Sequence, residues 1–212
     1  SLLNPASITN DSINYLIFRV KPSKFGINEL NSMLLASKLK LDNNFDLAII
    51  FNGLGGDLYS EFGNETILSF KLNNFITLGA SFEINHLKIK NYSNQNLVFL
   101  NFGSTIRIAD NLYTGFALRN IFRNYTANFD KTIFQESILG ISYLLDENLI
   151  FDLDAVIIIN SYSAFNFAVN YCFDENIRAR FAVRTNPIFY EVASQFNLFN
   201  NFYIMIGASY NP

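Results

Sequence analysis

The sequence has no tryptophan, one cysteine, one histidine and few charged residues. The lone Cys172 excludes a disulfide scaffold, because such scaffolds need cysteines in pairs. Only 16% of the 212 residues are charged, and 15 basic residues against 18 acidic ones give a net charge of -3. Without a basic surplus, we expect no nucleic-acid partner. The low charge and the apolar content of 50% exclude intrinsic disorder.

Long hydrophobic runs are also missing, although the chain is as apolar as many membrane proteins. The mean hydropathy is +0.17, yet the longest purely apolar run comprises only residues 155–159. A membrane-spanning helix needs about 20 consecutive apolar residues. The sequence therefore excludes a helical membrane protein, and its apolar residues must serve another arrangement.

Alternation with a period of two runs along almost the whole chain, as expected for strands with two different faces. Most of the alternating segments have 9–13 residues, which suits membrane-spanning strands of about 9–11 residues better than globular strands of about 5–6. Thirteen predicted strands cover residues 13–21, 29–40, 44–54, 63–72, 74–88, 96–108, 111–122, 132–144, 148–160, 162–173, 176–186, 188–198 and 201–210.

The connections between these segments are of two kinds. One kind is short and carries Asn or Asp where a tight turn needs residues that tolerate the left-handed region. The other kind is predicted to be longer and irregular, and includes the glycine-rich residues 53–56, which no phosphate-binding motif follows. Short turns at one end and longer loops at the other are typical of outer-membrane barrels. The short turns lie within residues 41–47, 72–78, 109–115, 145–151, 173–179 and 199–205, and the longer loops within 53–63, 90–95 and 122–131.

The composition of the two faces separates a membrane barrel from a soluble β-sandwich, which also alternates. A solvated face should carry roughly 25–35% charged residues, whereas the polar face here is rich in Gly, Ser and Ala, such as Gly79, Ser81 and Gly103. The apolar face is dense in Phe, Leu and Ile, as a lipid-facing band would be. We predict an all-β fold, an antiparallel transmembrane β-barrel of about 14 strands that forms a single domain over residues 1–212. A soluble sandwich is the alternative.

Four short motifs resemble the FadL-like and PorV-like family of outer-membrane β-barrel proteins, and in particular its PorV-type branch. They are SLLNPASI (1–8), with the motif Asn4, Pro5 and Ala6; NLYTGFALRNI (111–121); ENIRARFAVRTNP (175–187); and GASYNP (207–212). The resemblance implies fourteen strands, with a last strand after residue 212, and an N-terminal segment over residues 1–12 that carries the Asn-Pro-Ala motif.

Charged side chains on the small, polar face are the candidate site. Their signs nearly cancel, and a charge in a partly desolvated interior is costly unless it is paired, so we predict a network of ion pairs that braces the barrel. The alternative is a polar lining for a solute path, and its best candidates are Arg178, Arg180 and Arg184. Asp152 and Asp154, two strands earlier, are the plausible partners of these arginines. The predicted network comprises Asp46, Glu65, Lys71, Glu83, Arg107, Arg119, Asp152, Asp154, Arg178, Arg180, Arg184 and Glu191.

No catalytic or metal-binding constellation is apparent. His86 has no acid–base or metal partner at a suitable spacing and is predicted to lie at the barrel rim. Cys172 has no nearby histidine to activate it. We therefore expect a non-enzymatic protein without cofactor or metal.

Three functions are consistent with these features. The resemblance implies a PorV-like scaffold or carrier for protein partners, as in type IX secretion. The first alternative is a FadL-like passive transporter of hydrophobic small molecules, which an apolar inner lining would favour. The second alternative is a soluble β-sandwich binding module. For the barrel we expect the outer membrane of a Gram-negative bacterium, contacts with its lipid and lipopolysaccharide, and protein partners in a membrane complex.

Overall fold

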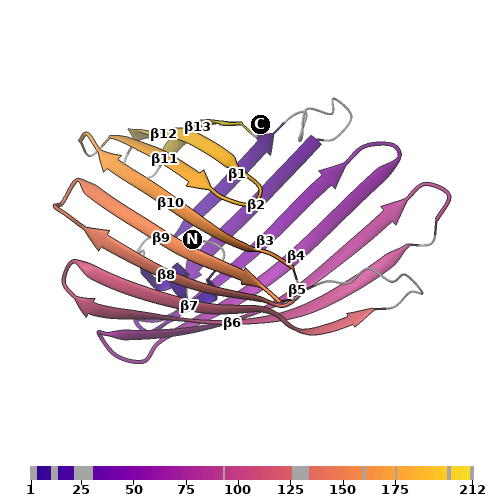
Figure 1. Cartoon of the computed structure of the whole chain (residues 1–212), viewed down its shortest axis with the longest axis horizontal. Coiled ribbons are helices and arrows are strands. Elements are labelled where there is room, and N and C mark those ends of the chain that lie inside the picture. Colours follow the sequence, from indigo (N-terminus) through magenta and orange to yellow (C-terminus); the bar gives the residue numbers. More distant parts are fainter. Residues whose placement is uncertain are drawn as a thin grey trace. The chain divides into compact units, whose positions relative to one another are not determined.

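Thirteen antiparallel strands form one sheet in sequence order in the computed structural model (Figure 1). The structure describes residues 4–10, 14–21, 31–92, 94–125, 134–159, 161–174, 176–199 and 202–210. The strands are β1 (Tyr15–Lys21), β2 (Asn31–Lys40), β3 (Phe45–Gly55), β4 (Tyr59–Lys71), β5 (Ile76–Ile89), β6 (Gln95–Ala109), β7 (Leu112–Tyr125), β8 (Glu136–Leu144), β9 (Leu149–Ile158), β10 (Ser163–Cys172), β11 (Ile177–Arg184), β12 (Phe189–Phe199) and β13 (Phe202–Tyr210).

All thirteen predicted strands are present, which confirms the strand prediction. The largest differences at their ends are four residues, where β4 begins at Tyr59 rather than 63 and β8 begins at Glu136 rather than 132. The prediction of a long loop over residues 53–63 is wrong, because β3 continues to Gly55 and only residues 56–58 form the turn. The predicted loop over 122–131 begins later, since β7 continues to Tyr125, and its remainder lies outside the described residues.

The chain divides into two compact units. Unit 1 comprises residues 1–104 and 117–135, and unit 2 comprises residues 105–116 and 136–212. Strands β1–β5 belong to unit 1 and strands β8–β13 to unit 2, while β6 and β7 contribute to both. The single domain predicted from the sequence stays a prediction.

The two faces of the sheet in unit 1 are opposite in character. Along β5, Leu78 and Phe82 are exposed, whereas Ser81 and Glu83, the two neighbours of Phe82 in the chain, are buried. Phe18 on β1 is 71% exposed. A water-soluble protein buries such side chains, so exposing them over strand after strand requires an apolar surrounding. We call the side with these residues the apolar face and the opposite side the inner face.

Unit 2 shows the same division. Its apolar face exposes Leu153, Phe165 and Phe181, which are 51%, 56% and 44% accessible. The opposite side, here called the polar face, carries Asp152 on β9, Asn170 on β10 and Arg180 on β11. Asn170 is the register partner of Arg180, whereas Asp152 lies opposite Ala168, two residues earlier on β10. Because the side-chain period of a strand is two, a one-residue slip would exchange the two faces.

The predicted short turns are present where the structure describes them, and residues 200–201 of the turn within 199–205 lie outside the described residues. The Asn and Asp residues of these turns act differently from the prediction. Asn73, Asp146 and Asp174 each accept two hydrogen bonds through Oδ1, from the backbone N–H groups two and three residues later, at 2.7–2.9 Å. None of these three residues has a positive φ. Among the described non-glycine residues, a positive φ occurs only at Asn91, Asn120 and Asn186, which lie elsewhere. The side chains therefore serve as acceptors that close the turn rather than as left-handed residues.

Removing such an acceptor should weaken the hairpin. We expect Asp146→Ala to lower the free energy of unfolding by about 1 kcal/mol, because two backbone N–H groups lose their partner. Asp42→Ala is the matched control, since Asp42 Oδ1 accepts a single backbone bond among the described residues, from the N–H of the next residue, Asn43. Urea unfolding of the detergent-solubilised variants measures both, and equal losses would contradict this assignment.

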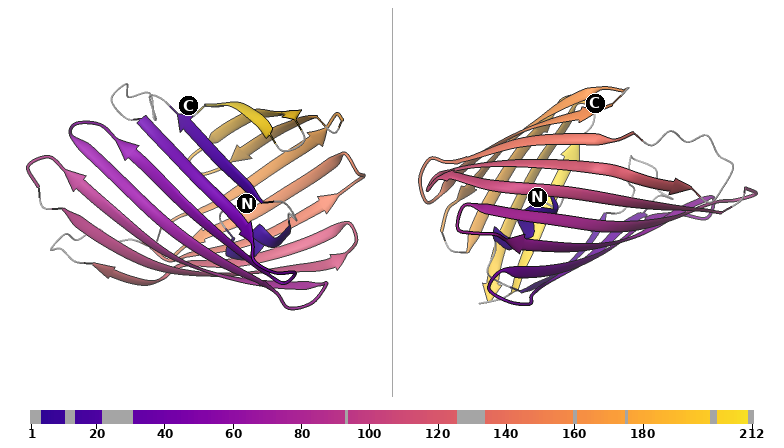
Figure 2. Two further views of the ribbon diagram at one scale, coloured as in Figure 1. Left: turned by 180° about the vertical axis from the view of Figure 1, so that it is seen from behind. Right: turned by 90° about the horizontal axis from the view of Figure 1, so that it is seen from below.

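A short 3-10 helix, η1 (Pro5–Asn10), lies against the inner face of unit 1 and contacts β3, β4 and β5 (Figure 2). The N–H of Ser7 donates to the carbonyl of Asn4 at 3.0 Å and begins the helical turn. No helix among the described residues is long and apolar enough to cross a membrane.

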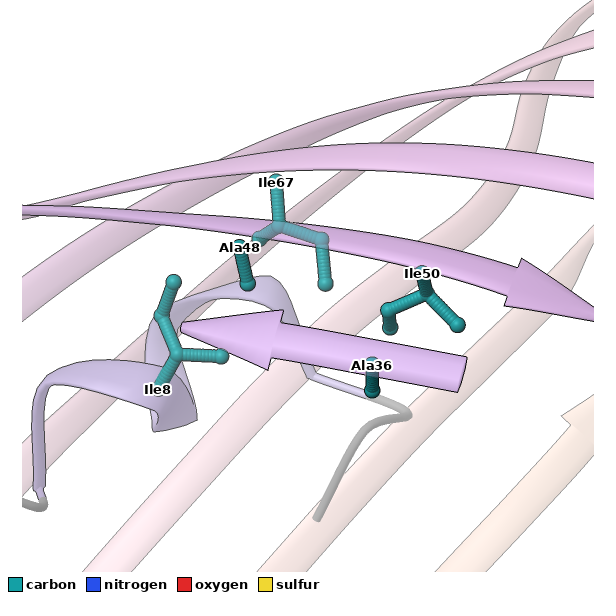
Figure 3. Packing of buried hydrophobic residues seen from close by; sticks show 5 residues of the cluster. All are labelled: Ile8, Ala36, Ala48, Ile50 and Ile67. Atoms are coloured by element: carbon teal, nitrogen blue, oxygen red, sulfur yellow. The ribbon is translucent and has the colours of Figure 1, made fainter. Parts of the chain in front are cut away.

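The buried apolar cluster of unit 1 lies between this helix and the sheet. Ile8 points from η1 toward Ala48 and Ile67, with Ala36 and Ile50 beside them (Figure 3). All five are at most 4% exposed. Burial of these side chains stabilises η1 on the inner face at about 25 cal/mol per Å² of apolar surface.

Candidate functional site: the inner and polar faces

The Asn-Pro-Ala motif fixes the N-terminal segment to the sheet. The side chain of Asn4 donates from Nδ2 to the carbonyl of Ser104 at 3.0 Å and accepts through Oδ1 from the N–H of Ala6 at 3.0 Å. Ser69 Oγ on β4 lies 3.4 Å from the carbonyl of Ala6. One amide thus connects the first described residue to a strand 100 positions later.

Two glycines on the inner face make this close approach possible. A Cβ at Gly79 would overlap the backbone atoms of Pro5 and Ala6, and a Cβ at Gly103 would overlap the side chain of Asn4. Backbone atoms cannot move aside as a flexible side chain can. Gly79 therefore defines the place where the segment docks, which is one of the uses of glycine in a strand.

A buried polar network crosses four strands of unit 1. Ser81 Oγ donates to Glu65 Oε1 at 2.6 Å, and Asn101 Nδ2 donates to Ser81 Oγ at 2.9 Å. The Asn101 Oδ1 accepts from the N–H of Asn120 at 2.8 Å. Asn101 is 1% exposed, so each of these bonds satisfies a group that water cannot reach. The network connects β4, β5, β6 and β7.

Ion pairs flank this network. Glu65 and Glu83 lie directly opposite each other in the β4–β5 register, and Arg119 Nη2 lies 3.6 Å from Glu83 Oε2. Lys38, which is fully buried, lies 3.9 Å from Asp46 Oδ1. The attraction between such opposite charges offsets only part of the cost of desolvating both of them, and Asp46 Oδ1 accepts no hydrogen bond among the described residues.

The polar face of unit 2 carries a second network, centred on Arg180. Its Nη1 donates to Asn170 Oδ1 at 2.8 Å and lies 3.5 Å from Asp152 Oδ2, while its Nε lies 4.0 Å from Glu191 Oε1. Asp152 also accepts from Ser142 Oγ at 2.7 Å and from Asn170 Nδ2 at 2.8 Å. This network is partly accessible, with Arg180 43% exposed.

We expect Arg180→Ala to destabilise the protein by about 1 kcal/mol, the scale of a partly exposed ion pair. Asp152 keeps its bonds from Ser142 and Asn170, which limits the loss. Because salt screens such pairs, the difference from the wild type should shrink at 1 M NaCl, where the Debye length is about 3 Å. Thermal unfolding at low and high salt measures this. A large change in conductance with unchanged thermal stability would contradict a bracing role.

The structure brings some of the predicted charged residues together and leaves others apart. Arg107 pairs with Asp110 in the adjacent turn at 2.6 Å, outside the predicted set. Within the described part of the chain, Lys71, Asp154, Arg178 and Arg184 make no ion pair. Arg178 instead borders an open hollow of about 320 Å³ on the polar face, together with Asn170 and Gln195. Arg178 presents hydrogen-bond donors and a positive charge to this hollow, and the two amides present donors and acceptors. This lining fits the alternative of a polar path for a solute.

Sequence reasoning missed several inner residues. Lys38 is two residues from Ala36 and therefore on the same face, so alternation could have predicted that it points inward. Ser81 and Asn101 are not in the predicted network because they carry no charge. Leu97 and Phe99 also face inward, at 5% and 4% exposure. Their inward direction could not be predicted, because residues 97–100 are all apolar and show no alternation.

The residues with catalytic potential are not assembled into a site. His86 Nδ1 lies 2.6 Å from Asn96 Oδ1 on the apolar face near the end of β5, and Cys172 Sγ donates to the carbonyl of Asp174. Among the described residues, no three His, Cys, Asp or Glu side chains are placed to hold a metal ion.

No protein-family model and no curated protein matches the sequence. Solved structures do resemble the chain. The CymD monoaromatic hydrocarbon channel aligns with a TM-score of 0.70 and 10% identity, covering 99% of this chain and 86% of CymD. The Pseudomonas putida toluene transporter TodX aligns with a TM-score of 0.70 and 9% identity, covering 98% and 86%. The outer membrane phospholipase A of Escherichia coli aligns with a TM-score of 0.50 and 11% identity, covering 85% and 88%.

At this identity the likeness shows the fold, and the fold is that of the bacterial outer-membrane β-barrels. The predicted fold class is confirmed, and the location of proteins with this fold is the outer membrane. Most of the similar structures are porins or transport channels, although the phospholipase is an enzyme. Nothing in them is specific to the PorV-type branch.

Proposed function

We propose that the protein is a passive outer-membrane channel, FadL-like in kind, that admits small hydrophobic molecules. The observation that carries this proposal is the apolar part of the inner face of unit 1. Ile50, Ile67, Leu97 and Phe99 all point to that side, with Ile50 and Ile67 packed beneath η1, where a barrel that only needed bracing could carry polar or small residues throughout. An apolar inner lining is the feature that favours transport of hydrophobic molecules over the other candidate functions.

The solved structures support the same choice. CymD is a channel for monoaromatic hydrocarbons and TodX is a toluene transporter, so the shared fold is compatible with passage of such molecules. The PorV-like role as a carrier for protein partners rests on the sequence motifs alone. The similar structures therefore favour the transport alternative over the carrier role.

The chemistry of an apolar solute supplies the driving force for its passage. Ile50 and Ile67 are covered by η1 and at most 3% exposed, so the gain of about 25 cal/mol per Å² of surface that leaves water comes from other apolar groups that the solute meets. Glu65, Ser81 and Asn101 satisfy one another, so this part of the inner face does not require hydrogen bonds from the solute.

Toluene uptake by cells that carry the protein in the outer membrane tests this proposal. We expect the wild type to raise the uptake rate above an empty-vector control. Ala48→Phe overpacks the cluster beneath η1, displaces this helix away from the sheet toward the inner side and should lower uptake several-fold. Ala164→Phe is the matched control, because Ala164 is equally buried, at 0% against 3% exposure, but lies on the polar face of unit 2.

Both variants add the same volume, and overpacking costs about 1–3 kcal/mol at either position. Uptake is therefore compared at equal amounts of folded protein. Wild-type uptake at the vector level would overturn the proposal. If, in addition, the tagged protein co-purified with a stoichiometric protein partner, the carrier role would be supported instead.

A further inference from the structure

A hollow of about 370 Å³ lies where the β3–β4 turn meets the end of β5 in unit 1. Its walls include Ser60, Lys88 and Lys90 together with residues 56–59. Backbone hydrogen bonds hold it open: the N–H of Lys90 donates to the carbonyl of Leu58 at 2.9 Å, and that of Gly56 to the carbonyl of Tyr59 at 2.8 Å. The hollow is thus part of the folded sheet.

The hollow opens beside the apolar face, just beyond the apolar band. Ser60 and Lys88 are register partners, and the next pair inward is Phe62 with His86. Along β5 the apolar face carries Phe82 and Ile84 and then changes to His86 and Lys88. This change marks the level at which hydrocarbon gives way to lipid headgroups, where lysine is found on membrane proteins.

The lengths of the connections assign this end of the sheet to the cell exterior. The three connections longer than four residues, 22–30, 90–94 and 126–135, are all at this end, beside the shorter 56–58, 159–162 and 185–188. Every connection at the other end has four residues or fewer, as in 72–75 and 145–148. Outer-membrane barrels have their longer loops outside and their short turns in the periplasm. The hollow therefore lies at the outer leaflet, whose lipid is lipopolysaccharide.

The charges in the hollow favour an anion. Neither Lys88 nor Lys90 has an ion-pair partner in the part of the chain that the structure describes. Asp57 also borders the hollow, which leaves a net charge of one positive unit. The hydroxyl of Ser60 adds a neutral donor. Two ammonium groups and a hydroxyl suit a phosphate group, whose oxygens accept charge-assisted hydrogen bonds.

We propose that Lys88, Lys90 and Ser60 bind a phosphate group of lipopolysaccharide in the outer leaflet. The acyl chains of the same lipid lie along the apolar face, where Phe62 is 55% and Phe82 is 44% exposed. The hollow thus binds the polar end of a lipid whose apolar end covers the neighbouring strands. This inference does not depend on the proposed transport function.

Native mass spectrometry of the detergent-solubilised protein, titrated with diphosphoryl lipid A, tests the proposal. We expect the double variant Lys88→Gln/Lys90→Gln to bind lipid A at least tenfold more weakly than the wild type. Lys88→Arg/Lys90→Arg keeps both charges and should retain binding. Lys40→Gln is the control, since Lys40 is an exposed lysine at the opposite end of the strands.

Two further lipids identify the recognised group. Dephosphorylated lipid A should bind the wild type as weakly as lipid A binds the double variant. Phosphatidylglycerol should also bind more weakly than lipid A. Three results would overturn the proposal: equal loss of lipid A binding in Lys40→Gln, binding that does not depend on the phosphates, or phosphatidylglycerol binding that equals lipid A and depends on the two lysines.

Discussion

Replacing Gly79 by valine should release the N-terminal segment from the sheet. The new Cβ would overlap the backbone of Pro5 and Ala6, and these atoms are fixed by the bond from the Ala6 N–H to Asn4 and by the burial of Ile8. Overpacking of a tight contact typically costs about 1–3 kcal/mol. We expect the free energy of docking of the segment to become less favourable by this amount. Backbone hydrogen exchange over residues 4–10 measures the result, and we expect protection of Ala6 and Ser7 to be lost.

The control for this variant is Gly207→Ala on β13. A Cβ at Gly207 would lie 3.1 Å from the carbonyl of Val192 and 3.2 Å from Ala193, a tight contact that involves no residue of the N-terminal segment. Gly207→Ala should leave the exchange of Ala6 and Ser7 unchanged. Unaltered protection of these two residues in Gly79→Val would show that the segment does not need the glycine.

The second large effect is expected at Asn101. Asn101→Leu removes the acceptor for the N–H of Asn120 and the donor to Ser81 in a place where water cannot replace them. Each unsatisfied buried group costs about 1–3 kcal/mol, so the sum over the network should be about 2–4 kcal/mol. Asn120 has φ of 58°, and without the bond to Asn101 this left-handed conformation loses its support. Urea unfolding in detergent measures the loss.

Asn96→Leu is the matched control for Asn101→Leu. Asn96 is on the same strand but on the apolar face, where it meets His86 near the strand end. An exposed asparagine there can be replaced at a cost well under that of Asn101. Equal losses in the two variants would contradict the role of Asn101 as the connector of β4 to β7.

The period of the sequence predicted the strands and their faces because alternation in a strand is local. Phe82 and Glu83 had to point to opposite sides wherever the strand lay. The partners of the charged residues could not be predicted in the same way, since they depend on register. Arg180 reaches Asp152 diagonally across β10, because its own register partner is Asn170 and that of Asp152 is Ala168. Arg178, two residues away on the same face, makes no such pair among the described residues.

Two further features have no strong signal in the sequence. Residues 5–10 form only two turns of a 3-10 helix, too few for a hydrophobic period to appear. Their position depends on Gly79 and Gly103, which alternation marks only as small residues. The turns were located correctly from Asn and Asp, yet the identity of their hydrogen bonds required the geometry.

The bond between Asn4 and the carbonyl of Ser104 spans 100 positions, while the strands of the described chain pair with their neighbours in sequence order. Hairpins can therefore form one after another as the chain becomes available, with little loop closure at each step. The N-terminal segment cannot take its place until β6 exists to receive it. The first residues of the chain thus reach their native contacts only after the first six strands have assembled.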